Sequence, residues 1–149
     1  VSYLADRLFA KIITGESQLY RPVKTMLIGS MSASAALKNP LFQEEHKVVI
    51  TSGDRTDMIV AALGSNASAV ILTNNIMPPA NLIAKASKLE IPLLLVATDT
   101  YAVAKQIDSM ESLPTKDDTD KIALIEQMIN THVQLKEFGF RPPSERNAR

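Results

Sequence analysis

Three short, strongly apolar runs constrain the fold of this chain more than any other feature. They lie at 48–50, 70–72 and 93–97, and each ends in a small polar turn followed by helix-forming sequence. Continuous apolar runs, rather than alternating ones, are typical of strands buried on both faces. Strands that alternate with helices form a parallel or mostly parallel sheet covered by helices. The sequence therefore predicts an α/β domain with a mostly parallel sheet.

The same reading predicts the order of elements. Strands are expected over 23–28, 47–51, 69–72 and 92–96, and helices over 32–38, 55–63, 79–89, 100–110 and from 120 to about 137. Residues 3–14 have apolar positions at helical spacing, so a helix ending at Gly15 is expected there. The tail over 138–149 contains two prolines, a glycine and several charges, and is expected to be a linker.

Composition removes several classes of function. The 149 residues suffice for one domain, and 16 basic residues balance 16 acidic ones, so nucleic-acid binding has no electrostatic support. The absence of cysteine excludes disulfides and thiolate chemistry, and His46 and His132 lie too far apart in sequence to suggest a zinc site. No apolar run approaches the roughly 20 residues needed to cross a membrane, and no signal peptide opens the sequence. A cytoplasmic protein without metal or cofactor is expected.

The turn at 52–55 is the strongest candidate for ligand binding. Gly53 permits a positive φ or the close approach of a ligand, and Arg55 can meet a phosphate or carboxylate with two hydrogen bonds. In the alternative structural interpretation, Asp54 caps the next helix and Arg55 pairs with a neighbouring carboxylate. Both interpretations stay open, because capping and binding use the same geometry. No Gly-Lys-Ser/Thr sequence exists, so this is not a Walker loop.

Two further strand ends carry polar candidates. Thr73 and Asn74 follow one apolar run, and Asp99 and Thr100 follow the next. Because parallel strands present their carboxyl ends at one edge of a sheet, these residues and Arg55 are expected to share a crevice there. Each also has an ordinary role in a turn or a helix cap. No Gly-x-Ser-x-Gly elbow occurs in the chain, so no catalytic residue is predicted.

Three motifs together carry a resemblance to a known family: Gly53-Asp54-Arg55-Thr56-Asp57, Ile71 to Asn75 with Pro78, and Ile91 to Val96 leading to Asp99-Thr100-Tyr101. With these motifs the chain resembles the DRTGG domain over about residues 16–133. The family pattern has two glycines after Asp-Arg-Thr, and Asp57-Met58 replace them here, as in the branch fused to phosphotransacetylases. This departure removes backbone freedom from a phosphate cradle of glycine amides.

The resemblance implies a three-layer α/β/α sandwich similar to the amino-terminal domain of HPr kinase/phosphorylase. It implies a joining helix over 1–15 after a dethiobiotin-synthetase-like domain, a DRTGG-like domain over 16–137, and a linker over 138–149 towards an acetyl-transferring domain. The family offers no catalytic residues, so Gly53, Asp54, Arg55, Thr73, Asn74, Asp99 and Thr100 are candidates for ligand binding only.

The expected function is a non-catalytic regulatory or oligomerisation module of a phosphate acetyltransferase-like protein that senses a small anionic metabolite or nucleotide. The alternative is a stand-alone ligand-sensing protein. A homo-oligomer, most often a two-fold dimer, is also expected. The apolar face with Ile125, Ile129 and Val133 would mediate it, unless that face is internal core.

Overall fold

The computed structural model describes residues 1–111 and 118–132. The chain forms two compact units, Val1–Met110 and Glu111–Arg149. The first unit contains a five-stranded sheet in the order β1-β5-β4-β3-β2. Its strands are β1 (Lys11–Thr14), β2 (Thr25–Ile28), β3 (Lys47–Ser52), β4 (Ala69–Thr73) and β5 (Leu93–Leu95). Strands β2 to β5 are parallel and β1 is antiparallel to β5, so the predicted mostly parallel sheet is confirmed.

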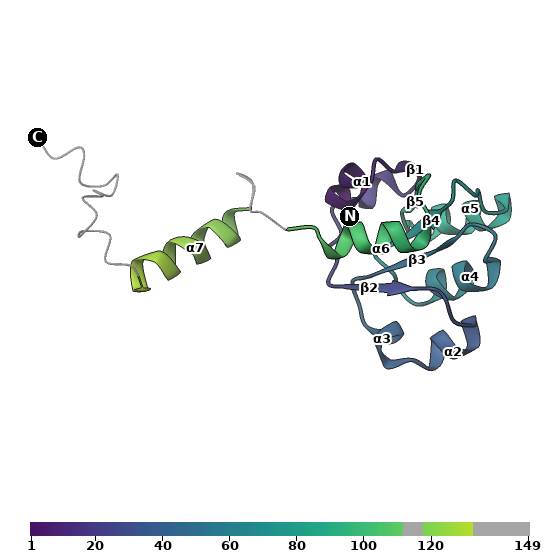
Figure 1. Ribbon diagram of the computed structural model, residues 1–149, viewed down its shortest axis with the longest axis horizontal. Helices are drawn as coiled ribbons and strands as arrows, with labels where there is room; N and C mark the ends of the chain where they lie inside the picture. Colours follow the sequence, from purple (N-terminus) through teal and green to yellow (C-terminus); the bar gives the residue numbers. More distant parts are fainter. Residues whose placement is uncertain (112–117, 133–149) are drawn as a thin grey trace, which may run out of the picture. The chain divides into compact units, whose positions relative to one another are not determined.

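Helices cover both faces of this sheet (Figure 1). One face carries α2 (Ala33–Lys38), α3 (Pro40–Gln43), α4 (Thr56–Gly64) and α5 (Ala80–Lys88), and the other carries α1 (Ser2–Arg7) and α6 (Thr100–Asp108). A 3-10 helix, η1 (Glu16–Gln18), follows β1. The three-layer α/β/α arrangement is therefore confirmed.

The central strands are buried on both sides. In β3, Val49 packs with the α2–α5 layer, whereas Val48 and Ile50 pack with α1 and α6, and all three are fully buried. β4 alternates in the same way. Two buried faces explain why these strands read as continuous apolar runs rather than as alternating patterns.

The loops after β4 and β5 differ in the face of the sheet to which they lead. From β2 to β5 each strand lies beside the previous one, and every crossover runs through the α2–α5 layer. After β5 the chain passes to the opposite face as α6. The loops after β4 and β5 therefore leave the sheet towards opposite faces, which is the arrangement that opens ligand crevices in parallel sheets.

The helix expected over 3–14 is wrong in its second half. Helix α1 ends at Arg7, Phe9 adopts a positive φ of 50°, and Lys11–Thr14 forms the edge strand β1. Its register pairs Lys11 with Leu95 and Ile12 with Leu94. The adjacent isoleucines Ile12 and Ile13 suit a strand, and pairing with β5 makes this segment a strand and not a helix. The role of residues 1–15 as a join to an upstream domain stays a prediction, as does the division at 16–137 and 138–149.

A second short helix follows the predicted one over 32–38. Ser32 caps α2 by accepting a hydrogen bond from the Ala35 N–H at 3.2 Å. The helix stops before Asn39-Pro40, as expected, but Asn39 then caps α3 through the Leu41 N–H at 3.0 Å. Because proline cannot continue α2 but suits the first turn of a helix, α2 ends before Pro40 and α3 begins with it.

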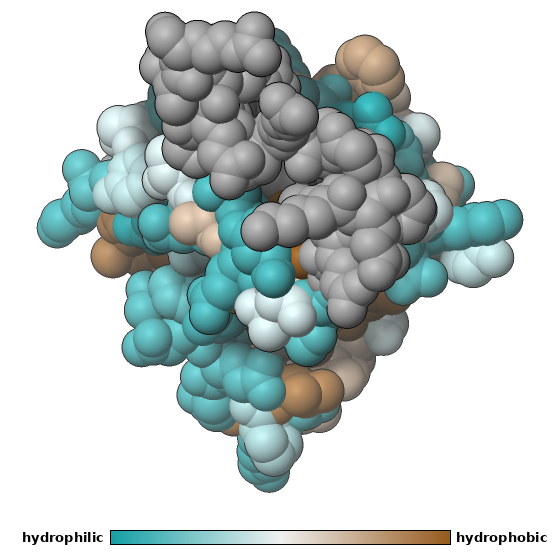
Figure 2. All heavy atoms as spheres, turned by 90° about the vertical axis from the view of Figure 1, so that its left-hand side faces the viewer, coloured by the Kyte–Doolittle hydropathy of each residue, from teal (hydrophilic) through white to brown (hydrophobic). Residues whose placement is uncertain are grey.

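The second unit contains α7 (Thr119–His132), which begins one residue before the predicted helix from 120 to about 137 and otherwise coincides with it over the described residues. Residues 133–149, including Val133 and the predicted linker, lie outside the described part of the chain. Among the helices that the structure describes, none combines the length and apolar character needed to cross a membrane. On the face shown in Figure 2, hydrophilic residues prevail and hydrophobic residues form separate patches.

Candidate functional site

Backbone hydrogen bonds join the turns after β4 and β5, and another holds the turn after β2 against β3. The Asn74 N–H donates to the Thr98 carbonyl at 2.9 Å, and the Asn75 N–H donates to the Val96 carbonyl at 2.8 Å. At the other end of this edge, the Gly29 N–H donates to the Ile50 carbonyl at 2.8 Å. The candidate residues therefore lie along one edge of the sheet, as their positions after parallel strands predict.

Gly53 has a structural reason that involves no ligand. Its φ is not positive, and a Cβ placed on it would lie 1.7 Å from the Ile76 carbonyl oxygen. The close approach that requires glycine is thus made by the loop after β4, which packs directly on the turn after β3. Gly53 joins the two turns and leaves no open backbone cradle at this point.

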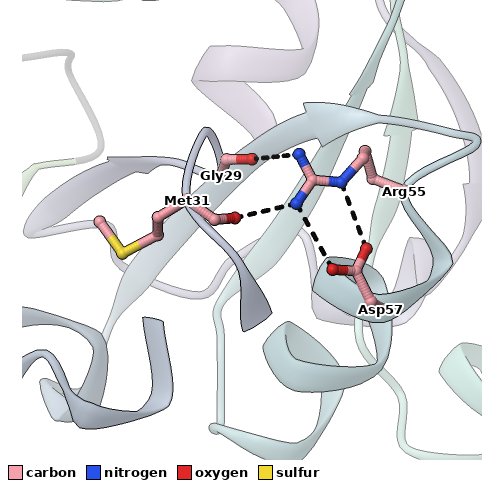
Figure 3. A network of polar contacts seen from close by, with 4 residues as sticks. All are labelled: Gly29, Met31, Arg55 and Asp57. Carbon is pink, nitrogen blue, oxygen red and sulfur yellow. Dashed lines mark hydrogen bonds and ion pairs between the residues drawn. The ribbon is translucent and has the colours of Figure 1, made fainter. Parts of the chain in front are cut away.

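The Arg55 guanidinium is engaged by the chain itself (Figure 3). Nε donates to Asp57 Oδ1 at 3.2 Å, and Nη2 donates to Asp57 Oδ2 at 3.4 Å and to the Met31 carbonyl at 2.8 Å. Nη1 donates to the Gly29 carbonyl at 3.4 Å. The guanidinium thereby ties the turn after β2 to the start of α4. In this geometry Arg55 pairs with a neighbouring carboxylate, as in the structural interpretation of the sequence.

The contact with Arg55 changes the pKa of the Asp57 carboxyl. The Arg55 hydrogen bond is the largest influence that lowers the pKa of the Asp57 carboxyl below its ordinary value of 3.8, and the Met58 backbone N–H adds to it. Asp57 also lies in the first turn of α4, where the helix dipole favours a negative charge. The sequence reading did not identify Asp57 as the partner of Arg55, although a carboxylate two residues after an arginine at a helix start was the available signal.

Asp54 does not cap α4, so that interpretation is wrong. The residue at the N-cap position is Arg55, which makes no side-chain cap, and the Asp54 side chain has no hydrogen bond or ion pair among the described residues. The Thr56 N–H donates instead to the Asp54 backbone carbonyl at 2.9 Å. Its backbone makes that turn, and the exposed carboxylate is left facing solvent at the sheet edge.

The remaining four candidates meet where the loops after β4 and β5 separate. Thr73 is fully buried, and its hydroxyl lies 2.9 Å from that of Thr100. Asn74 is exposed, has a positive φ of 61°, and its amide approaches the Thr73 hydroxyl at 3.4 Å. Asp99 caps α6 by accepting from the Ala102 N–H at 2.9 Å. Asn74 and Asp99 are therefore the solvent-facing members of this group, and Thr73 is part of the core.

Thr51 is a polar residue that the sequence reading missed. It lies in β3 with 2% of its surface exposed, and its hydroxyl oxygen is the one buried side-chain polar atom among the described residues without a hydrogen-bond partner. Its position inside an apolar strand hid it. The described residues also contain no group of three or more side chains suited to hold a metal ion.

Comparisons with known proteins agree with this architecture. A phosphate acetyltransferase of Nitratidesulfovibrio vulgaris strain Hildenborough is 26% identical over 150 residues, and the match covers 94% of this chain and 21% of that protein. The chain thus spans a minor part of the relative's length.

A similar fold occurs in the crystal structure of the CBS and DRTGG domains of the regulatory region of Clostridium perfringens pyrophosphatase, complexed with the activator diadenosine tetraphosphate. The TM-score is 0.62 at 19% identity, over 88% of this chain and 60% of that one. At this identity the likeness concerns the fold. The model of the DRTGG domain family matches residues 3–110, which include every strand of the sheet and the turns described above. The chain belongs to the DRTGG domain family.

Proposed function

We propose that this chain is a non-catalytic regulatory domain of a phosphate acetyltransferase-like protein, in which it senses a nucleotide or another small anionic metabolite. The observation that carries the proposal is the polar edge at which the loops after β4 and β5 leave towards opposite faces. Parallel sheets bind ligands outside their strand ends at such points. The parent enzyme class interconverts acetyl-CoA and acetyl phosphate.

The chemistry of this edge suits binding better than catalysis. Its accessible groups are an amide at Asn74 and carboxylates at Asp54 and Asp99, and its hydroxyls at Thr73 and Thr100 bond to each other. The sequence contains no cysteine, and His46 precedes β3 at the opposite edge of the sheet. A nucleophile paired with a base is thus missing from the described part of this edge.

Two comparisons support the regulatory role. The Clostridium perfringens structure with a similar fold belongs to a regulatory region bound to a nucleotide activator. The matched phosphate acetyltransferase is several times longer than this chain, which leaves room for catalysis elsewhere in a protein of that kind. A stand-alone sensing protein is the alternative, and it would bind the same class of ligand without an acyltransferase domain.

Calorimetric titration of the whole chain with nucleotides, acetyl-CoA and pyruvate tests the proposal. We expect a member of this panel to bind the native chain and to bind Asn74→Ala at least tenfold more weakly. Asn66→Ala is the matched control, because Asn66 is also exposed and has a similar positive φ of 55° but precedes β4 at the opposite edge. Equal loss in both variants, or no binding by the native chain, contradicts the proposal.

Regulation in the parent protein provides the second measurement. Deleting this domain from a phosphate acetyltransferase that contains it should leave acetyl transfer in place and remove its response to the bound metabolite. Loss of the acetyl-transfer chemistry itself through a point substitution at Asn74 or Asp99 would contradict a non-catalytic role.

A further inference from the structure

The one guanidinium among the strand-end turns already holds an anion. Asp57 accepts from Arg55 through both carboxylate oxygens, at 3.2 and 3.4 Å, which is the bidentate geometry that a phosphate or a substrate carboxylate would use. The Met31 carbonyl takes a further Nη2 bond, and the Gly29 carbonyl takes a bond from Nη1. Figure 3 shows the carboxylate on one side of the guanidinium and the two carbonyls on the other.

The strand-end turns contain no second cation to replace Arg55. The turns at 29–32, 52–57, 73–75 and 98–100 contain this arginine and three carboxylates, Asp54, Asp57 and Asp99. The formal charge of these segments is therefore negative. An incoming anion would meet that charge and would also have to break an ion pair before it could bind the guanidinium through two hydrogen bonds.

The pair is nevertheless open to exchange with solvent. The Arg55 side chain is 35% exposed and the Asp57 side chain 50% exposed. Displacement of Asp57 by another oxyanion would thus not require the core to open. The carbonyl bonds to Gly29 and Met31 would keep the guanidinium in place while the carboxylate was exchanged.

We propose that Asp57 is the resident anion of Arg55 and determines ligand specificity at this edge, since an anionic ligand gains a bidentate contact with Arg55 only by displacing the Asp57 carboxylate. The proposal rests on the proposed function for its biological meaning and deepens it. In the native chain, simple oxyanions are excluded, and a ligand must supply further contacts, such as hydrogen bonds to Asn74, to bind here.

Phosphate and pyrophosphate titrations of the whole chain test this directly. In Asp57→Ala the arginine loses its resident anion, and we expect both oxyanions to bind about ten- to a hundredfold more tightly than to the native chain, as expected for a charge-assisted hydrogen bond. Asp54→Ala is the matched control. It removes the same charge at a position three residues before Asp57, from a side chain that does not touch Arg55. It should change the affinity by less than about threefold. Equal gains in the two variants would show a general charge effect and overturn the proposal.

Two further measurements guard against an ambiguous result. Asp57→Ala combined with Arg55→Ala should lose the gain in affinity, and a retained gain would place the anion elsewhere. In the native chain, the NMR signal of the Arg55 Nε–H should move only at phosphate concentrations about ten- to a hundredfold higher than those that half-saturate Asp57→Ala. If Asp57→Ala does not fold, Asp57→Asn takes its place, and a shift of the native signal at low phosphate overturns the proposal by itself.

These outcomes are separate from those of the proposed function. If no nucleotide or metabolite binds the chain, the regulatory proposal fails while the phosphate titration still decides the role of Asp57. If a nucleotide binds in an Asn74-dependent way and its affinity for Asp57→Ala is unchanged, the regulatory proposal stands and only a phosphate contact with Arg55 is excluded.

Discussion

The buried hydroxyl of Thr51 lowers the stability of the fold. The residue is 2% exposed within β3, and its hydroxyl has no partner among the described residues. A buried polar group without a hydrogen bond costs about 1–3 kcal/mol of desolvation. Valine has nearly the same shape without that cost, and it favours a strand equally well.

We therefore expect Thr51→Val to stabilise the chain by about 1 kcal/mol, which raises Tm by roughly 3–4 °C in a domain of this size. Thr73→Val is the matched control, because the Thr73 hydroxyl is buried but paired with Thr100 at 2.9 Å. Its loss should lower stability by about 0.5–1.5 kcal/mol. Thermal unfolding of both variants measures the difference. Changes of the same sign would show that Thr51 is satisfied in solution.

Asp57 makes the stability depend on pH in the acid range. Because Arg55 lowers the pKa of its carboxyl below 3.8 in the folded chain, the folded state binds the proton less readily than the unfolded state. The stabilisation is complete above pH 3.8 and is lost as the pH falls through the lowered folded pKa. The Tm difference between the native chain and Asp57→Asn should therefore shrink as the solution is acidified. A difference independent of pH contradicts the ion pair.

At the scale of the elements, Gly53 controls the approach of two loops. A Cβ at this position would overlap the Ile76 backbone, with 1.7 Å to the carbonyl oxygen and 2.6 Å to the carbonyl carbon. The obstacle is backbone and not the end of a flexible side chain, so the loop after β4 would have to shift as a whole. Such overpacking costs about 1–3 kcal/mol or more.

Gly53→Ala should accordingly lower the unfolding free energy by at least about 2 kcal/mol in denaturant titrations. Gly64→Ala is the internal control, because Gly64 ends α4 and nothing lies within 4 Å of its added Cβ. That substitution should be neutral or stabilising by about 0.4–1 kcal/mol, since alanine reduces the entropy of the unfolded chain. Similar losses in both variants would mean that the loop contact at Gly53 is unimportant.

At the scale of the whole molecule, α7 is the element most suited to self-association. None of its described residues is buried within its own unit, and its apolar side chains include Leu124, Ile125, Met128 and Ile129. An amphipathic helix that exposes such a face commonly binds another apolar surface. The predicted dimer stays a prediction, and its contact through Val133 lies outside the described residues.

We expect the chain to sediment as a dimer at high micromolar concentration and Ile125→Asp with Ile129→Asp to sediment as a monomer. Asn130→Asp adds a charge on the polar side of the same helix and should leave the dimer intact. Sedimentation velocity distinguishes the species. A native chain that remains monomeric throughout this range would remove α7 as an association surface.

The local pattern of residues determined most of the architecture. Buried strands such as β3 and β4 could be predicted because burial on both faces leaves an unbroken apolar run, and their helices because caps and helical spacing are local signals. The gathering of the strand-end turns also followed from the sequence, because parallel strands share a carboxyl edge. The binding roles of the candidate residues at that edge stay predictions.

Only the tertiary structure decided features that depend on a partner distant in the chain. Lys11–Thr14 becomes a strand because β5 offers it an unpaired edge, and Gly53 is required because the Ile76 backbone lies against it. Asp54 and Asp57 are both carboxylates beside Arg55, yet only Asp57 reaches the guanidinium that Gly29 and Met31 orient. Spacing shows which groups are near in sequence, whereas hydrogen bonds depend on distances of a few tenths of an ångström that folding alone sets.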